Sequence, residues 1–179
     1  MPKATILIVE DEAVVAEDLS QQLARLGYTV CGITGLGEEA VSLARERRPD
    51  VILMDIRLKG PMDGIKAAEL IRRDGKAPVI YLTAHSDSAT LQRAKLTGPF
   101  GYILKPFEER ELETQIEIAL YKHQLERDLR RSNAELQHFN DLMCGRELRM
   151  IELKKEVDAL CAKYGEALRY GYAPSKTGP

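Results

Sequence analysis

The sequence predicts a doubly wound α/β domain followed by a long helical extension. Over about the first 107 residues, short apolar runs alternate with amphipathic segments. The runs are apolar on consecutive rather than alternate residues, which is typical of strands buried on both faces of a parallel sheet. After Pro106 these runs stop, and apolar residues recur at heptad spacing instead. That spacing, sustained over several heptads, is typical of a coiled coil.

Five runs are predicted to be strands: residues 4–9, 28–33, 51–54, 78–82 and 100–104. The segments between them, at about 12–26, 38–47, 64–73 and 87–96, have the pattern of helices. Gly27 is well placed to end the first helix, and Asp87 or Ser88 could cap the fourth. Strands that alternate with helices form a parallel sheet through right-handed crossovers. We expect the flavodoxin-like strand order 2-1-3-4-5.

Composition and charge limit the classes of protein to consider. The chain has 179 residues, a net charge of −2 and 44% hydrophobic residues, which suits a globular protein with no general attraction to nucleic acid or anionic membranes. No apolar stretch approaches the roughly 20 residues that span a bilayer, and the N-terminus does not resemble a secretion signal. We therefore expect a cytoplasmic protein. The cysteines, Cys31, Cys144 and Cys161, match no metal or redox spacing and are predicted to be reduced.

The extension carries two rows of residues at heptad spacing. One row is Leu129, Leu136, Met143, Met150, Val157 and Tyr164, and the other is Leu125, Ser132, Phe139, Arg146, Leu153, Leu160 and Ala167. Only Ser132 and Arg146 interrupt the apolar pattern. A continuous helix over about 108–168 would be roughly 90 Å long, and no single domain could bury it. We therefore expect it to form a coiled coil in a homodimer.

Gly145 is the weakest point of this predicted helix. A glycine costs about 1 kcal/mol in a helix interior, and polar Arg146 follows it, so a kink or break is expected here. The alternative is a helical hairpin within one chain that folds back at Cys144–Gly145. The predicted divisions are 1–120 for the globular domain, 121–168 for the coil and 169–179 for a disordered tail. Parallel and antiparallel pairing of the coil both remain open.

Polar side chains follow four of the five predicted strands. Glu10 and Asp11 follow the first, Asp55 the third, Thr83 the fourth and Lys105 the fifth. In an open parallel sheet, ligands bind beyond the carboxyl ends of the strands, near the switch point in strand order. Three converging carboxylates repel one another unless a cation lies among them, and oxygen ligands of this kind suit Mg²⁺. A lone aspartate at a strand end usually caps a turn, but this combination indicates a site for phosphoryl chemistry.

Residues 4 to about 120 resemble the receiver domain of bacterial two-component response regulators. The matching motifs are the acid pair in ILIVEDE, Asp55 in VILMDIRL, Thr83 in YLTAHSD, and Lys105 with Pro106 in GYILKPF. The resemblance implies that Asp55 accepts a phosphoryl group from a phosphohistidine on a histidine kinase or phosphotransfer protein. It also implies that Lys105 bridges to the phosphoryl group and that Thr83 shifts to meet it.

The resemblance further implies a Mg²⁺ site and an aromatic switch. Asp11 would be a direct ligand with Glu10 assisting, and Asp55 and the main-chain carbonyl of Arg57 would complete the protein ligands. Tyr102 stands where the family has an aromatic residue whose ring turns inward on activation, and the bond between Lys105 and Pro106 is usually cis. This sequence departs from the family in two ways. It has Glu10 where Asp is commoner, and the loop IRLKGPMDG after Asp55 is one residue longer than usual.

The favoured function is a phosphorylation switch rather than an enzyme, with slow loss of its own phosphoryl group and with the coil passing the signal to an unidentified protein. The chain could stand alone or form the N-terminal part of a hybrid sensor kinase, whose connector coils the extension resembles. No kinase core or DNA-reading module follows, and Gly145 stands where a similar kinase helix carries its phosphorylated histidine. A haloacid-dehalogenase-type phosphohydrolase would need an aspartate at Arg57. In an RNA-binding antiterminator, a compact helical unit would follow residue 150, where the sequence instead continues as a coil.

Overall fold

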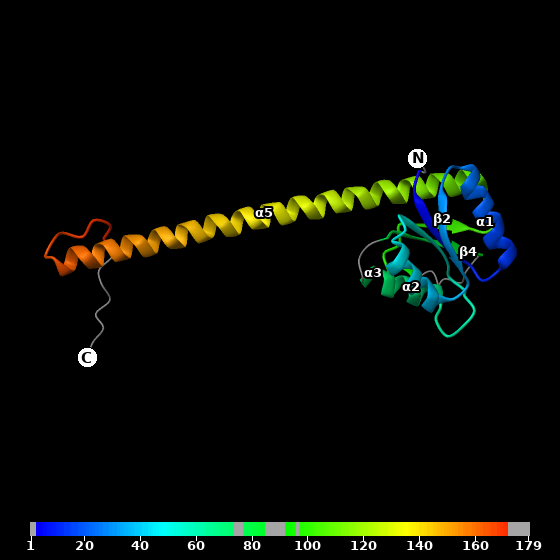
Figure 1. Ribbon diagram of the computed structural model, residues 1–179, viewed down its shortest axis with the longest axis horizontal. Helices are drawn as coiled ribbons and strands as arrows, with labels where there is room; N and C mark the ends of the chain where they lie inside the picture. The colour runs from blue at the N-terminus through cyan, green and yellow to red at the C-terminus, as the bar shows by residue number, and fades with distance from the viewer. Residues whose placement is uncertain (1–2, 74–76, 85–91, 96, 172–179) are drawn as a thin grey trace. The chain divides into compact units, whose positions relative to one another are not determined.

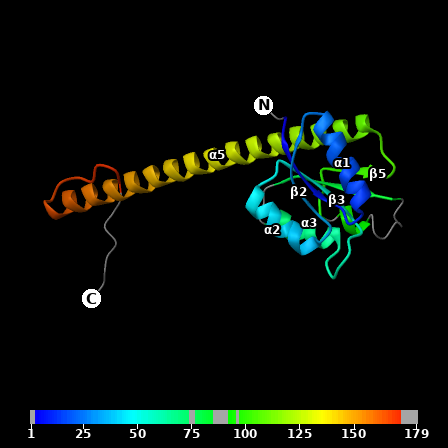
Figure 2. The same ribbon diagram turned by 45° about the vertical axis from the view of Figure 1, so that its right-hand side comes forward.

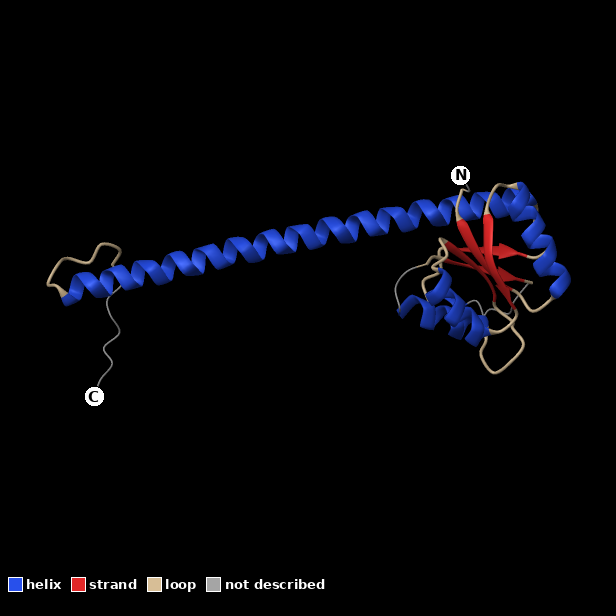
Figure 3. Cartoon of the chain, in the orientation of Figure 1, coloured by secondary structure: helices blue, strands red, loops and turns tan. Residues whose placement is uncertain are grey.

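A computed structural model describes residues 3–73, 77–84, 92–95 and 97–171 of the chain. Its centre is a five-stranded parallel sheet in the order β2-β1-β3-β4-β5, as the sequence predicted (Figure 3). The strands are β1 Thr5–Val9, β2 Thr29–Thr34, β3 Val51–Asp55, β4 Val79–Thr83 and β5 Gly101–Leu104. Asp55 and Thr83 were expected to follow their strands, but each is the last residue of its strand, because its backbone still pairs with the neighbouring strand.

Four helices have bounds close to those expected: α1 Ala13–Arg25, α2 Gly37–Arg47, α3 Gly64–Arg73 and α5 Glu109–Lys163. Gly27 follows α1 with a φ of 85°, which is the left-handed conformation of a helix stop, as predicted. The helix expected over 87–96, with its candidate caps Asp87 and Ser88, lies largely outside the described residues. Within that segment, residues 92–95 are helical.

The sheet is covered by helices on both faces (Figures 1 and 2). On one face α1 and the first turns of α5 bury Leu19, Leu23, Leu112 and Ile116 against the strands. On the other face α2 and α3 bury a second apolar cluster that includes Ile71. All five residues of β3 and of β4 are buried, which is why their sequence is apolar without alternation.

Helix α5 runs from Glu109 to Lys163 as one helix. It passes through Gly145 without interruption, so the expected break is absent and the helical-hairpin alternative is wrong. A helix tolerates a single glycine when its neighbours favour helix, and Met143, Arg146 and Glu147 around it are good helix formers. The chain divides into two compact units, and the second begins at Arg127. The predicted divisions at residues 120 and 168 stay predictions.

The helix ends five residues earlier than expected, in a capping motif at Gly165. Gly165 has a φ of 75°, its N–H donates to the carbonyl of Ala162, and the N–H of Glu166 donates to the carbonyl of Cys161 at 2.8 Å. This is the Schellman pattern, which satisfies the last carbonyls of a helix. Two heptad positions, Tyr164 and Ala167, therefore lie beyond the helix, contrary to the predicted coil.

Residues 164–171, here called the return segment, are hydrogen-bonded to the end of α5. The buried carboxylate of Asp158 accepts the N–H groups of Arg169 and Tyr170, at 2.7 and 2.9 Å, and the Lys154 ammonium lies 5.6 Å from the centre of the Tyr170 ring. Residues 169–171 were predicted to belong to a disordered tail, and these contacts show why they are ordered instead. The rest of that predicted tail, 172–179, lies outside the described residues.

Gly64 sets how closely α3 can approach the acceptor strand. A Cβ at this position would lie 1.9 Å from the carbonyl oxygen of Asp55, and the N–H of Gly64 donates to the carbonyl of Ile56 at 3.1 Å. No side chain fits in that space, and the nearest atoms are backbone, which cannot move aside cheaply. The first turn of α3 is therefore packed directly against the end of β3.

We predict that Gly64→Ala lowers the free energy of unfolding by about 3 kcal/mol, since the new methyl group forces the backbone of β3 and α3 apart. Urea unfolding followed by circular dichroism measures the change. The matched control is Gly145→Ala, where a Cβ meets nothing within 4 Å. That substitution is expected to stabilise its helix by about 1 kcal/mol. Equal effects of the two substitutions would contradict the close packing at Gly64.

Candidate functional site: an acidic cluster at the carboxyl end of the sheet

The carboxyl ends of β1, β3, β4 and β5 meet at one edge of the sheet. The N–H of Glu10 donates to the carbonyl of Thr34 at 2.8 Å, and the N–H of Lys105 donates to the carbonyl of Thr83 at 2.8 Å. Asp55 pairs with Leu82 across β3 and β4. These backbone contacts fix the positions from which the polar side chains project.

The three predicted acids converge at this edge. Glu10, Asp11 and Asp55 each offer a carboxylate oxygen, and these oxygens lie within 4.8 Å of one another. Glu10 and Asp55 are buried, whereas Asp11 is half-buried. The possible ligands are carboxylate oxygens, which are the hard donor atoms that a divalent cation such as Mg²⁺ prefers. Three carboxylates this close together repel one another unless positive charge lies among them.

Lys105 lies between two of these acids. Its ammonium donates to Oε2 of Glu10 at 2.5 Å and to Oδ2 of Asp55. Only 16% of the Lys105 side chain is exposed, and the Glu10 side chain is fully buried. A buried ion pair of this kind is costly to break, because removing one partner leaves the other charge without compensation.

The surroundings shift the pKa values of both partners. Burial raises the pKa of Glu10, and although the hydrogen bond from Lys105 opposes this, the nearby charge of Asp55 adds to it. Burial alone would lower the pKa of Lys105, but the hydrogen bonds to Asp55 and Glu10 outweigh it, so the pKa of Lys105 is raised. Lys105 therefore stays charged at neutral pH, and Glu10 takes up a proton more readily than an ordinary glutamate.

The backbone after β3 orients the Asp55 carboxylate. The N–H of Arg57 donates to Oδ1 of Asp55 at 2.9 Å, while Oδ2 accepts the hydrogen bond from Lys105. The two oxygens are thus held by different partners, and the carboxylate has a fixed rotation. Arg57 was predicted to act through its main-chain carbonyl, and that role stays a prediction; its N–H contact was not foreseen.

Lys59 is a site residue that the sequence reasoning missed. Its ammonium lies 3.3 Å from Oδ2 of Asp11 and donates to the main-chain carbonyl of Asp11 at 3.0 Å. The signal was present in the sequence, since Lys59 falls in the loop after Asp55 that is one residue longer than usual. The reach of a side chain from such a loop depends on the loop's backbone, which the sequence did not specify.

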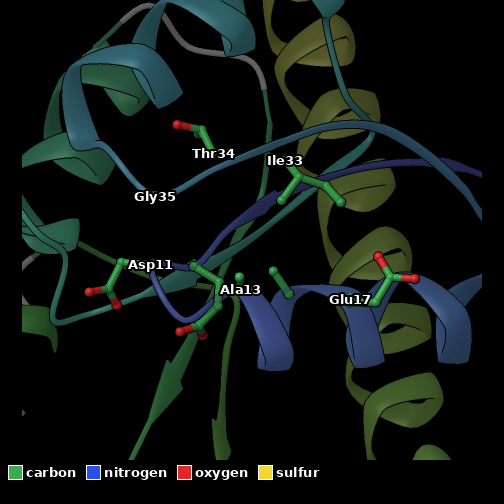
Figure 4. A pocket seen from close by; sticks show the side chains of 8 residues that line it. Asp11, Ala13, Glu17, Ile33, Thr34 and Gly35 are labelled. Carbon is green, nitrogen blue, oxygen red and sulfur yellow. The ribbon is translucent and has the colours of Figure 1, made fainter.

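A cavity of about 330 Å³ adjoins the acid pair on the α1 side. Figure 4 shows Asp11 next to Ala13 at the start of α1, with Glu17 further along the helix and with Ile33, Thr34 and Gly35 at and just after the end of β2. A Cβ at Gly35 would lie 3.0 Å from the Cα of Asp11, so this glycine allows the two loops to approach closely. The acidic edge is therefore open on this side.

The predicted switch residues, Thr83 and Tyr102, lie on neighbouring strands. Thr83 is buried at the end of β4. The Tyr102 ring packs against Tyr81, with 5.8 Å between the ring centres, and among the described residues its buried hydroxyl has no hydrogen-bond partner. The Tyr81 hydroxyl, by contrast, pairs with Thr97 at 2.9 Å, and burial raises the pKa of Tyr81 to about 12. The bond between Lys105 and Pro106 is cis, as expected.

This fold and this cluster together define a receiver domain of two-component signalling. Residues 6–117 match the family described as the response regulator receiver domain, and the chain belongs to that family. It is 40% identical over 115 residues to the transcriptional regulatory protein PdtaR of Mycobacterium tuberculosis, a match that covers 64% of this chain and 56% of PdtaR. The chain thus spans about half the length of the curated relatives it matches.

Solved structures show the same domain. The signal receiver domain of a modulated diguanylate cyclase from Desulfovibrio desulfuricans G20 is 43% identical, with a TM-score of 0.66 over 69% of this chain and 98% of that one. The receiver domain of sensor histidine kinase PA1611 from Pseudomonas aeruginosa PAO1 is 33% identical, with a TM-score of 0.61 over 65% and 97% of the two chains. That structure has a magnesium ion coordinated in its active site cleft.

Among the residues that the structure describes, no helix combines the length and the apolar character needed to cross a bilayer.

We predict that Lys105→Met lowers the free energy of unfolding by about 3 kcal/mol at pH 8 in Mg²⁺-free buffer, because Glu10 and Asp55 lose their shared cation. The deficit should shrink at pH 5. Without Lys105 the pKa of Glu10 rises further above its ordinary 4.5, so the folded variant holds the proton more tightly than the unfolded chain and gains stability as pH falls toward 4.5.

Urea unfolding at both pH values measures this effect. The matched control is Lys3→Met, which removes a lysine whose pair with Glu113 is half-exposed. Such a surface pair contributes little, so the control should stay close to the wild type at both pH values. A deficit of Lys105→Met that does not change with pH would contradict the role given to Glu10.

Proposed function

We propose that this protein is a response regulator that accepts a phosphoryl group on Asp55 from a histidine kinase or a phosphotransfer protein. The observation that carries the proposal is the fixed Asp55 carboxylate, which lies among two further acids and a buried lysine at the carboxyl edge of the sheet. Transfer of a phosphoryl group to a carboxylate depends mainly on positioning and on neutralisation of charge. Both are provided by groups of this chain.

Each residue has a distinct part in this transfer. The Arg57 N–H holds Asp55 in one rotation, so that one carboxylate oxygen is directed to the incoming phosphorus. Lys105 exchanges its contact with Asp55 for one with a phosphoryl oxygen, which keeps the ammonium paired throughout. Thr83, at the end of the adjacent strand, donates its hydroxyl to another phosphoryl oxygen.

Mg²⁺ would be held by the carboxylates of Asp11 and Asp55 and the main-chain carbonyl of Arg57, with Glu10 assisting. When bound, this ion supplies positive charge that offsets the charge on the phosphoryl oxygens. Glu10 keeps Lys105 in place from the other side, through the 2.5 Å contact. A magnesium ion is coordinated in the active site cleft of the related PA1611 receiver domain, which supports a Mg²⁺ site in this chain.

Phosphorylation would be read out through Tyr102. Its ring packs against Tyr81 and the second apolar cluster, while its buried hydroxyl has no hydrogen-bond partner among the described residues, so apolar contacts rather than a hydrogen bond hold the ring in this position. Movement of Thr83 toward the phosphoryl group would change the space available at the neighbouring β5 strand. The protein acts in this way as a switch and not by turnover of a metabolite.

We further propose that the extension pairs with a second copy of the chain and relays the signal to a downstream protein. Between residues 129 and 153 the two heptad rows are exposed: Leu136 and Phe139 are each 59% exposed and Leu129 is 63% exposed. Apolar surface of this extent on a helix is a mark of an interaction site. Heptad spacing favours another helix as the partner.

Acetyl phosphate tests the first proposal directly. In the presence of Mg²⁺, intact-protein mass spectrometry should show that the wild-type chain gains one phosphoryl group, and that Asp55→Asn gains none. Asp141→Asn, at an exposed aspartate of α5, is the matched control and should be labelled like the wild type. Labelling of Asp55→Asn, or no labelling of the wild type, would sink the assignment.

Sedimentation equilibrium tests the second proposal. The wild type should have twice the chain mass of 20.1 kDa, and a variant with Leu136→Glu and Met143→Glu should be monomeric, because both charges would lie in the paired seam. Leu148→Glu places the same charge at a residue that is 64% exposed but lies outside the two rows. This control should remain dimeric. A wild-type monomer at high concentration would refute the pairing.

A further inference from the structure

The loop after Asp55 holds Lys59 over the acidic cluster. Leu58 and Met62, on either side of Lys59, are both partly buried against the second apolar cluster. The loop also touches the start of α2, where a Cβ at Gly37 would lie 2.8 Å from the carbonyl oxygen of Met62. Between these anchors Gly60 turns the chain with a φ of 109°. The backbone of Lys59 therefore has a fixed place, although its side chain is 73% exposed.

The two lysines of the site serve different acids. Lys105 contacts Glu10 and Asp55, whereas Lys59 contacts Asp11, through both the carboxylate and the main-chain carbonyl. Asp11 is the most exposed of the three acids. Its Oδ2, the atom 3.3 Å from the Lys59 ammonium, belongs to the carboxylate that a divalent ion would need.

We propose that Lys59 is a built-in counter-cation of Asp11, which a divalent ion must displace in order to bind. The inference rests on the proposed function, because it takes the acidic cluster to be a Mg²⁺ site. Two positive groups cannot both approach Asp11 closely, since they repel each other as well as compete for the carboxylate. Lys59 therefore weakens the binding of Mg²⁺ and sets the ion concentration at which the site fills.

The size of the effect follows from the exposure of the pair. A salt bridge with one largely exposed partner is screened by water and salt. The repulsion of a doubly charged ion by one nearby ammonium is correspondingly modest. We expect removal of the Lys59 charge to tighten Mg²⁺ binding about three- to tenfold at low ionic strength. The gain should shrink as ionic strength rises.

Isothermal titration of the 179-residue chain with MgCl₂ measures this affinity without any phosphoryl donor. Lys59→Met should lower the Kd about three- to tenfold, and Lys59→Arg, which keeps the charge, should stay within about twofold of the wild type. The matched control is Lys3→Met, which removes the same charge from a half-exposed pair before β1, at the other end of the sheet. Its Kd should also be unchanged.

The outcomes separate this inference from the proposed function. If the wild type binds Mg²⁺ and Asp11→Asn abolishes the binding, an unchanged Kd in Lys59→Met overturns the role of Lys59 alone. An equal gain in Lys59→Met and Lys3→Met overturns it as well, because the effect would then be one of net charge. If the wild type shows no saturable binding, the Mg²⁺ site and the inference both fail. A repeat at about 0.5 M KCl should reduce the difference between Lys59→Met and the wild type, through screening.

Discussion

The ion pair of Lys105 with Glu10 and Asp55 is the interaction on which the site depends. A parallel sheet delivers the ends of its central strands to one edge, and here that edge carries three acids. Their mutual repulsion opposes folding unless positive charge lies among them. Lys105 supplies that charge from the end of β5, and Lys59 adds more from the loop after β3. The structure thus places three carboxylates at one edge of the sheet and pairs them with two lysines of the same chain, and the proposed Mg²⁺ ion and phosphoryl group would compete for these contacts.

Much of this arrangement could be predicted from the sequence because it follows from chain order. Apolar runs on consecutive residues identify buried strands, and alternation with helices fixes a parallel sheet, so Asp55 and Lys105 had to meet at its carboxyl edge. The contacts of Lys59 and of the Arg57 N–H could not be predicted in the same way. They depend on the backbone path of a loop, where Gly60 and the packing of Met62 decide the outcome.

For the extension, the sequence predicted the overall element better than its details. The heptad pattern predicted a long helix correctly, but the break expected at Gly145 and the helix end expected near residue 168 were both wrong. Gly145 looked like a break, yet the cost of one glycine is small beside that of ending and restarting a helix, which would leave carbonyl and N–H groups unpaired. The true end depends on Gly165 and on a contact between Asp158 and residues eleven and twelve positions later. Heptad spacing contains no information about such a contact.

The return segment covers one face of α5 near the end of the helix. Asp158 is buried by it, and Lys154, Val157 and Cys161, on the same face of α5, are half-buried. Val157 belongs to one of the two heptad rows, so in the proposed coiled coil a partner helix that slid toward this end by one repeat would collide with the return segment. Repetitive apolar seams are prone to slippage because successive repeats are nearly equivalent. In the proposed coiled coil, a physical stop at one terminus would remove that degeneracy and favour one alignment of the two helices.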